Sequence, residues 1–211
     1  MMVLPAINCE SFECVRERIQ IVNDFSEWIH IDITDAKFTS RKTWNNVGEF
    51  FLLKEKYPNK KFEIHLMVED VETAFFEWSR AKPEQIIIPF KTLKDSIAIL
   101  ERAKNYDIVV VLGLTVDDDL ERVKTHKDDF INYQVLAVMP GFSNQEFNIE
   151  AIEVIKNIRN FSQFALIEVD GGVNEKTIRL LKEAGANSVA SASFIFDNVS
   201  PKLAYEILLN S

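Results

Sequence analysis

The chain alternates between short apolar runs and longer segments in which apolar residues recur every three or four positions. The short runs predict strands, and the longer segments have the spacing of helices that are apolar on one face. The predicted strands cover 3–7, 28–35, 62–68, 85–90, 108–114, 133–139, 165–169 and 188–196. The predicted helices cover 11–23, 47–56, 70–81, 93–105, 117–130, 149–158, 175–184 and 201–209.

This alternation gives eight strand–helix units of about 26 residues each. Strands that are apolar throughout and alternate with amphipathic helices are typical of a parallel sheet covered by helices. Eight units favour a closed (β/α)8 TIM barrel over an open doubly wound sheet. No glycine-rich dinucleotide fingerprint follows the first strand, which further weakens the open-sheet alternative. We therefore predict an α/β protein in which residues 1–211 form a single barrel domain.

Composition and charge narrow the function. The net charge of −9 argues against nucleic acid or an anionic membrane as the main partner. The N-terminus has no signal-peptide pattern, and no apolar run reaches the ~18 residues of a membrane span. Cys9 and Cys14 are too few and too close together to read as a disulfide framework. We expect reduced thiols in a cytoplasmic protein.

Polar side chains interrupt three of the predicted strands. In segment 28–35, His30 and Asp32 lie on the face opposite the isoleucines, because side chains alternate along a strand. His65 and Asp170 lie in the third and seventh strands, and barrel enzymes place their chemistry at strand carboxyl ends. Two histidines and two carboxylates are a plausible ligand set for zinc, iron(II) or manganese, and hydrogen-bonded core residues are the alternative. His126, in a charged helix, is interpreted as a solvated bystander.

Two loops have the composition of phosphate sites. Segment 139–145 contains Gly141 and leads into a helix, and Gly171 and Gly172 precede another. Ser191–Ser193 follows in the last strand. Glycines allow backbone N–H groups to approach an anion, and barrels of this kind tend to bind phosphate after strands seven and eight. Ordinary turns are the alternative interpretation.

Four motifs in order resemble the ribulose-phosphate 3-epimerase family: 28–35 (WIHIDITD), 64–68 (IHLMV), 140–147 (PGFSNQEF) and 168–173 (EVDGGV). The resemblance extends from Leu4 to about Phe196. It implies a barrel of the ribulose-phosphate-binding type with one divalent metal ion per subunit, with Zn²⁺ favoured and Fe²⁺ or Mn²⁺ also compatible. The implied metal ligands are His30, Asp32, His65 and Asp170. The implied substrate-binding residues are Met67, Gly141, Phe142, Ser143, Asn144, Gly171, Gly172, Ala192 and Ser193.

The resemblance also implies an isomerase that interconverts D-ribulose 5-phosphate and D-xylulose 5-phosphate. The C2 carbonyl acidifies the C3 proton, and the metal stabilises the enediolate. Inversion needs a base on one face and an acid on the other, and Asp32 and Asp170 stand where the family has these carboxylates. Because metal contact and burial act in opposite directions, the two pKa values can differ.

Other positions depart from the family pattern. Ala6 stands where the family usually has a serine that touches substrate, and Thr34–Ala36 replaces Met-Asp-Gly, which predicts a more polar wall. Leu136 replaces a methionine, Ser143–Asn144 a glycine pair, and Ala192 a glycine. These departures leave two alternatives: a 3-epimerase for another ketose phosphate, for example a six-carbon one, or a non-catalytic barrel that binds sugar phosphates.

Family members often assemble, so we expect a homo-oligomer. Two phenylalanine pairs, Phe50–Phe51 and Phe75–Phe76, are possible contact patches. The core faces of their helices are the favoured interpretation.

Overall fold

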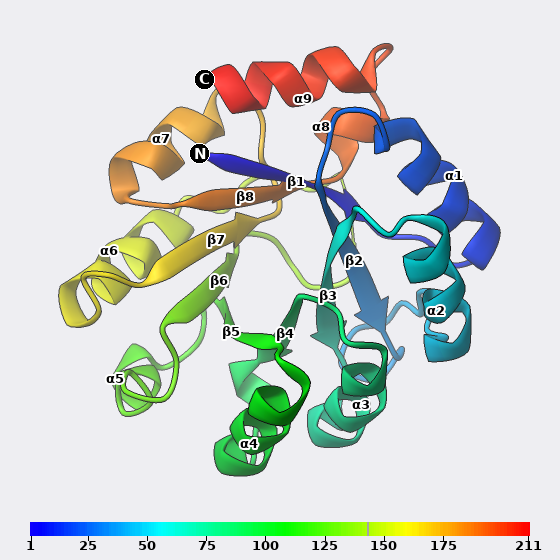
Figure 1. The fold of residues 1–211 in the computed structure, drawn as a ribbon. Coiled ribbons are helices and arrows are strands. Elements are labelled where there is room, and N and C mark those ends of the chain that lie inside the picture. Colours follow the sequence, from blue (N-terminus) through cyan, green and yellow to red (C-terminus); the bar gives the residue numbers. More distant parts are fainter. Residues whose placement is uncertain (143) are drawn as a thin grey trace.

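The computed structural model describes residues 1–142 and 144–211, and the strands in these ranges form one closed parallel barrel (Figure 1). Each strand pairs with its neighbours in chain order, and β1 pairs with β8 to close the barrel. The predicted (β/α)8 fold is confirmed. The strands are β1 (Met2–Ile7), β2 (Trp28–Thr34), β3 (Lys61–Met67), β4 (Gln85–Pro89), β5 (Val109–Thr115), β6 (Asn132–Leu136), β7 (Leu166–Asp170) and β8 (Ser188–Ser191).

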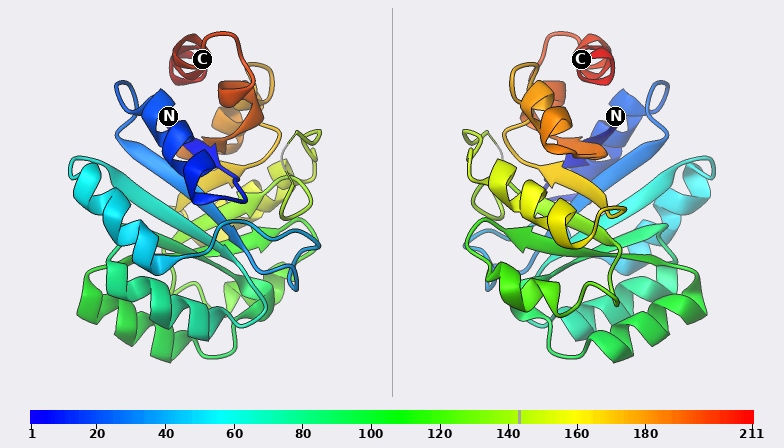
Figure 2. Two further views of the ribbon diagram at one scale, coloured as in Figure 1. Left: turned by 90° about the vertical axis from the view of Figure 1, so that its right-hand side faces the viewer. Right: turned by 90° about the vertical axis from the view of Figure 1, so that its left-hand side faces the viewer.

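Helices surround the barrel on the outside (Figures 1 and 2). They are α1 (Phe12–Val22), α2 (Val47–Lys56), α3 (Val71–Trp78), α4 (Ser96–Tyr106), α5 (Leu120–Lys124), α6 (Ala151–Phe161), α7 (Thr177–Ala184), α8 (Ser193–Phe196) and α9 (Pro201–Asn210). Two short 3-10 helices, η1 (Ser79–Ala81) and η2 (Phe90–Thr92), follow α3 and β4. None of the described helices has the length and apolar composition of a membrane span.

Local sequence signals fix several helix ends. The Ser11 side chain accepts a hydrogen bond from the backbone N–H of Cys14, and Asp70 accepts one from Thr73. These N-caps satisfy backbone donors that have no partner inside the helix. Gly185 ends α7 at a φ of 102°, in the left-handed region that glycine adopts without a steric penalty. These capping residues fix where each helix begins or ends, and therefore where the connecting loops lie.

The apolar core lies mainly between the barrel and its helices. Ile29, Ile31 and Ile33 of β2 are buried, whereas the alternate positions of that strand carry polar side chains. Phe50 and Phe75 are buried on α2 and α3, while Phe51 and Phe76 are partly exposed. Burying one such side chain contributes about 1.5–3 kcal/mol, which is an upper estimate. Because the isoleucines of β2 face the helices, the polar face of this strand points into the barrel.

Three predicted elements end earlier than expected. The helix predicted over 117–130 covers only Leu120–Lys124. It begins late because the Asp118 carboxylate accepts hydrogen bonds from Thr115 in a turn before it, and it ends where the Thr125 N–H bonds to Arg122 O. The strand predicted over 133–139 ends at Leu136. The strand predicted over 188–196 ends at Ser191, and Ser193–Phe196 forms α8. A short apolar run does not distinguish strand from helix by its periodicity.

The prediction of reduced thiols is wrong for this structure. Cys9 and Cys14 form a disulfide, with Cα atoms 5.8 Å apart. Cys9 follows β1 and Cys14 lies in the first turn of α1, where the Ser11 cap holds the chain in a tight bend. The turn therefore brings two thiols into bonding range although only five positions separate them.

Candidate active site

The four predicted metal ligands meet at the carboxyl end of the barrel. One donor atom from each of His30, Asp32, His65 and Asp170 lies within 4.8 Å of the others. Asp32 Oδ1 is 3.1 Å from His30 Nε2 and 3.2 Å from His65 Nδ1, and Asp170 Oδ2 is 3.7 Å from the same His65 nitrogen. The parallel register pairs Asp32 with His65 directly. Two imidazoles and two carboxylates at this spacing match the donor set of Zn²⁺ and similar cations.

A second polar layer lies below these ligands, inside the barrel. His30 Nδ1 lies 2.7 Å from Glu63 Oε1, and Gln134 Nε2 donates to Glu168 Oε1 at 3.1 Å. Glu168 Oε1 is also 3.7 Å from His30 Nδ1. A carboxylate only accepts hydrogen bonds, so Glu63 keeps the proton of His30 on Nδ1 and directs Nε2 towards Asp32. Such an outer partner orients a histidine for metal binding.

The two candidate acid–base carboxylates have different pKa values. Burial raises the pKa of Asp32, but hydrogen bonds from His30 and His65 outweigh burial and bring it well below its ordinary value. Burial, and then repulsion from Asp32, raise the pKa of Asp170 to about 6. The expected separation of the two pKa values is therefore present, and its causes are the histidine contacts of one carboxylate and the burial of the other.

The lower layer is also electrostatically coupled. Burial lowers the pKa of His30, but hydrogen bonds to Asp32 and Glu63 outweigh burial and raise it well above its ordinary value. Burial, followed by repulsion from Glu63, raises the pKa of Glu168 well above its usual range. Glu168 therefore holds its proton more tightly than an ordinary glutamate does. A metal ion and a proton compete for the Nε2 atom of His30.

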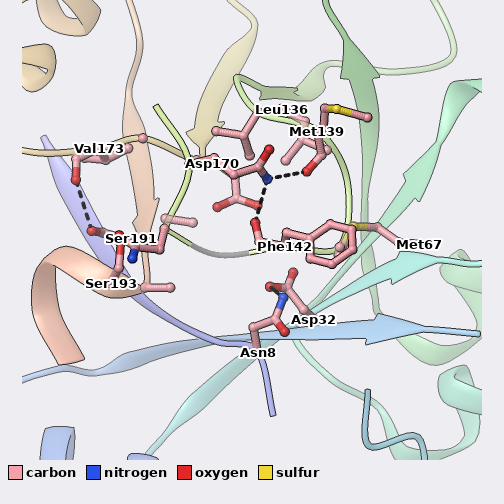
Figure 3. Close-up of a pocket in the computed structure, with 18 residues that line it drawn as sticks. Asn8, Asp32, Met67, Leu136, Met139, Phe142, Asp170, Val173, Ser191 and Ser193 are labelled. Atoms are coloured by element: carbon pink, nitrogen blue, oxygen red, sulfur yellow. Dashed lines mark hydrogen bonds between the residues drawn. The ribbon is translucent and has the colours of Figure 1, made fainter. Parts of the chain in front are cut away.

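The predicted substrate residues line one pocket above the ligands (Figure 3). Asp32 and Asp170 point into this pocket from opposite sides, with Phe142 between them in the view. Ser143, also predicted here, lies outside the described residues. The predicted residues that line the pocket are Asp32, Met67, Gly141, Phe142, Asn144, Asp170, Gly171, Gly172, Ala192 and Ser193.

Two glycines at the edge of the pocket have no room for a side chain. A Cβ on Gly171 would lie 2.4 Å from Val138 Cγ2, and a Cβ on Gly172 would lie 2.5 Å from Phe147 Cα. Both have a positive φ, which glycine tolerates. Asn144 adopts a φ of 63°, and asparagine is among the few other residues that enter this region readily. Asparagine therefore preserves a backbone conformation that a glycine would also allow.

The expected polar wall is not found. Thr34 is fully buried, and it is not among the described residues that line the pocket. Met67 and Leu136 form an apolar part of the lining. Leu136 therefore contributes to an apolar wall of the pocket. His126 lies apart from this site, 3.3 Å from Asp129.

Our sequence analysis missed four polar residues of the site, one of which is Gln134 of β6. Glu63 and Glu168 lie two positions before a predicted ligand, and this alternation could have placed them on the inner face. Asn8 follows β1 and donates a hydrogen bond to Asp32 at 3.2 Å. Its position at a strand carboxyl end was the available signal.

Comparison with known proteins identifies the family. The profile described as the ribulose-phosphate 3 epimerase family matches residues 2–196. The chain belongs to this family. Curated ribulose-phosphate 3-epimerases are similar over nearly their full length: that of Helicobacter pylori is 29% identical, covering 100% of this chain and 97% of the relative. That of Bacillus subtilis is 24% identical, covering 96% and 95%. The resemblance predicted from the four motifs is confirmed.

Solved structures support the fold of this epimerase family member. A 3-hexulose-6-phosphate synthase from Salmonella typhimurium superposes with a TM-score of 0.75 at 19% identity, covering 100% of this chain and 99% of that chain. A second 3-hexulose-6-phosphate synthase gives a TM-score of 0.73 at 18% identity, covering 99% and 98%. At these identities the likeness concerns the barrel alone.

Proposed function

We propose that this protein interconverts D-ribulose 5-phosphate and D-xylulose 5-phosphate by inverting C3. The observation that carries the proposal is the cluster of His30, Asp32, His65 and Asp170, two of which line the pocket, in a chain of the epimerase family. The donor chemistry of these four residues fits one divalent cation, with Zn²⁺ favoured. When bound, such a cation supplies Lewis-acid polarisation of the substrate oxygens.

Asp32 and Asp170 are the proposed acid and base. Their side chains face the same pocket from opposite sides, which suits removal of a proton from one face of C3 and delivery to the other (Figure 3). The separated pKa values allow one carboxylate to be ionised while the other carries a proton. Met67, 2% exposed, contributes an apolar surface that excludes water.

The phosphate of the substrate is proposed to bind at the edge of the pocket formed by the loops that follow β7 and β8. Gly171, Gly172 and Ser193 line the pocket there, and both glycines adopt a positive φ that most other residues avoid. Ala192 has a φ of −98°, so its methyl group does not strain the backbone. These features support binding of one phosphate by backbone N–H groups despite the acidic net charge.

The test follows the C3–H signal of D-ribulose 5-phosphate by proton NMR in D2O with the zinc-loaded protein. We expect this signal to disappear while D-xylulose 5-phosphate appears. Asp170→Asn is expected to abolish exchange, whereas Asp128→Asn, at an exposed position, serves as the matched control. Persistence of the C3–H signal at high enzyme concentration, with metal confirmed bound, refutes the proposal. Parallel turnover of a six-carbon ketose phosphate tests the alternative substrate.

We further propose that the chain acts as one domain, as a homo-oligomer and in the cytoplasm. A phosphorylated sugar substrate supports the location, since its charge keeps it inside the cell. The Cys9–Cys14 disulfide opposes it, because reducing compartments open such bonds. Trapping of free thiols in intact cells tests the location, and light scattering of the purified protein tests the assembly.

A further inference from the structure

Asn8 lies at the pocket, directly after β1. The register pairs Ala6 with His30 and Ile7 with Ile31, which places Asn8 level with Asp32. The residue is 8% exposed and lines the same pocket as the two aspartates. Figure 3 shows Asn8 beside Asp32. The residue therefore combines deep burial with a place in the site.

The carboxamide of Asn8 holds one oxygen of Asp32. Asn8 Nδ2 donates to Asp32 Oδ2 at 3.2 Å, whereas the other oxygen, Oδ1, lies between His30 and His65. Because an ionised carboxylate has no proton to donate, the amide nitrogen and not the amide oxygen must face it. This contact fixes the rotation of the Asp32 carboxylate.

Most of the hydrogen-bonding capacity of Asn8 is unused. A carboxamide has two N–H donors and an oxygen with two acceptor positions, and the bond to Asp32 uses one donor. Among the described residues, the buried oxygen Oδ1 has no hydrogen-bond partner. An unpaired buried oxygen is costly, so its retention at a pocket indicates that a ligand group pairs with this carboxamide.

Asn8 supplies the polar group at this edge of β1. Ala6 lies two residues earlier, on the same face of the chain, and its methyl group makes no hydrogen bond. The carboxamide of Asn8 lies one step nearer the carboxyl end of the strand. The strand that holds both residues runs between β2, with Asp32, and β8, with the proposed phosphate edge.

We propose that Asn8 recognises the substrate hydroxyl on C4, the carbon between the reacting centre and the phosphate-bearing carbon. The inference rests on the proposed function and adds a specificity residue to it. A hydroxyl group both donates and accepts, so it pairs with the free oxygen or the free N–H of the carboxamide. Asn8 thereby couples recognition of the sugar to the position of Asp32.

The test compares two non-reactive ligands by calorimetry on the zinc-loaded protein. One is a pentitol 5-phosphate, the substrate with its C2 carbonyl reduced, and the other is its 4-deoxy form. We expect the wild type to bind the first about tenfold more tightly, the value of one hydrogen bond. In Asn8→Ala this ratio should fall to about one, whereas in Asn157→Ala, an exposed control, it should remain.

The ratio separates recognition from structural damage, because a merely disturbed site weakens both ligands alike. A ratio that stays near tenfold in Asn8→Ala overturns the role of Asn8 and leaves the epimerase proposal intact. A wild-type ratio of one, with tight binding of both ligands, also overturns it. If the wild type binds neither ligand and exchanges no C3 proton, the proposed function fails, and the role of Asn8 fails with it.

Discussion

Removal of the Glu63 carboxylate tests how the lower polar layer supports the metal ligands. Glu63 Oε1 lies 2.7 Å from His30 Nδ1, and the two side chains are 2% and 0% exposed. A charge-assisted bond in such a setting is roughly twice as strong as a neutral one. Loss of an outer partner of a ligating histidine typically lowers metal affinity 10–100-fold, or about 1.4–2.7 kcal/mol. We expect Glu63→Gln near the lower limit, since its amide oxygen still accepts from His30, and Glu63→Ala above it.

Glu168 can partly replace the missing carboxylate. Its Oε1 atom is 3.7 Å from His30 Nδ1, and repulsion from Glu63 is one reason for its raised pKa. Without Glu63, the pKa of Glu168 falls and its ionised form becomes available to His30. The double variant Glu63→Ala/Glu168→Ala is therefore expected to lose more affinity than either single variant.

Competition with a chromophoric chelator measures these Zn²⁺ affinities at fixed pH. Glu101→Gln, on the exposed side of α4, is the matched control and should bind Zn²⁺ like the wild type. Thermal unfolding verifies that each variant is folded. Unchanged Zn²⁺ affinity in a folded double variant would refute the claim that these carboxylates orient His30.

Three further perturbations test the remaining structural arguments. Because the pKa of Glu168 is raised in the folded state, its stabilising contribution is lost as pH rises through that pKa. Glu168→Gln cannot ionise at this position. In denaturation of the metal-free proteins, its free energy of unfolding should match that of the wild type at acid pH and exceed it at alkaline pH. Reduction of the Cys9–Cys14 disulfide should lower the free energy of unfolding by about 2 kcal/mol, because the bond removes the chain entropy of a short loop from the unfolded state. Reductant should have no effect on the variant in which both cysteines are serine. Gly172→Ala should cost more than about 1 kcal/mol in urea denaturation, because its φ is +66° and the new Cβ meets the Phe147 backbone. Equal pH profiles for Glu168→Gln and the wild type would contradict the first argument. An unchanged unfolding midpoint after reduction would contradict the second, and wild-type stability of Gly172→Ala would contradict the third.

The alternation of apolar runs and amphipathic segments was sufficient to predict the barrel. Periodicity is a local property, and each strand–helix unit carries it independently. The same period placed His30, Asp32 and His65 on the polar faces of their strands, and the rule that barrels use strand carboxyl ends brought them together before any distance was known. Helix caps such as Ser11 and Asp70 were also readable, because they act within four residues of chain.

The tertiary structure decided what depends on distant neighbours. The end of β8 and the start of α8 fall within one apolar run, where only packing separates a strand from a helix. The Cys9–Cys14 disulfide depends on the bend between β1 and α1, which composition does not reveal.

The polar layer inside the barrel shows most clearly what the sequence alone did not determine. Glu63, Gln134 and Glu168 come from three strands, and only closure of the barrel brings their side chains and hydrogen bonds into one buried layer beneath His30. The sequence by itself thus determined the fold class and the candidate ligands, because both follow from local spacing. Hydrogen-bond partners, pKa shifts and the contact between Asn8 and Asp32 were decided in three dimensions, because burial and hydrogen bonding are properties of neighbours that lie far apart in the chain.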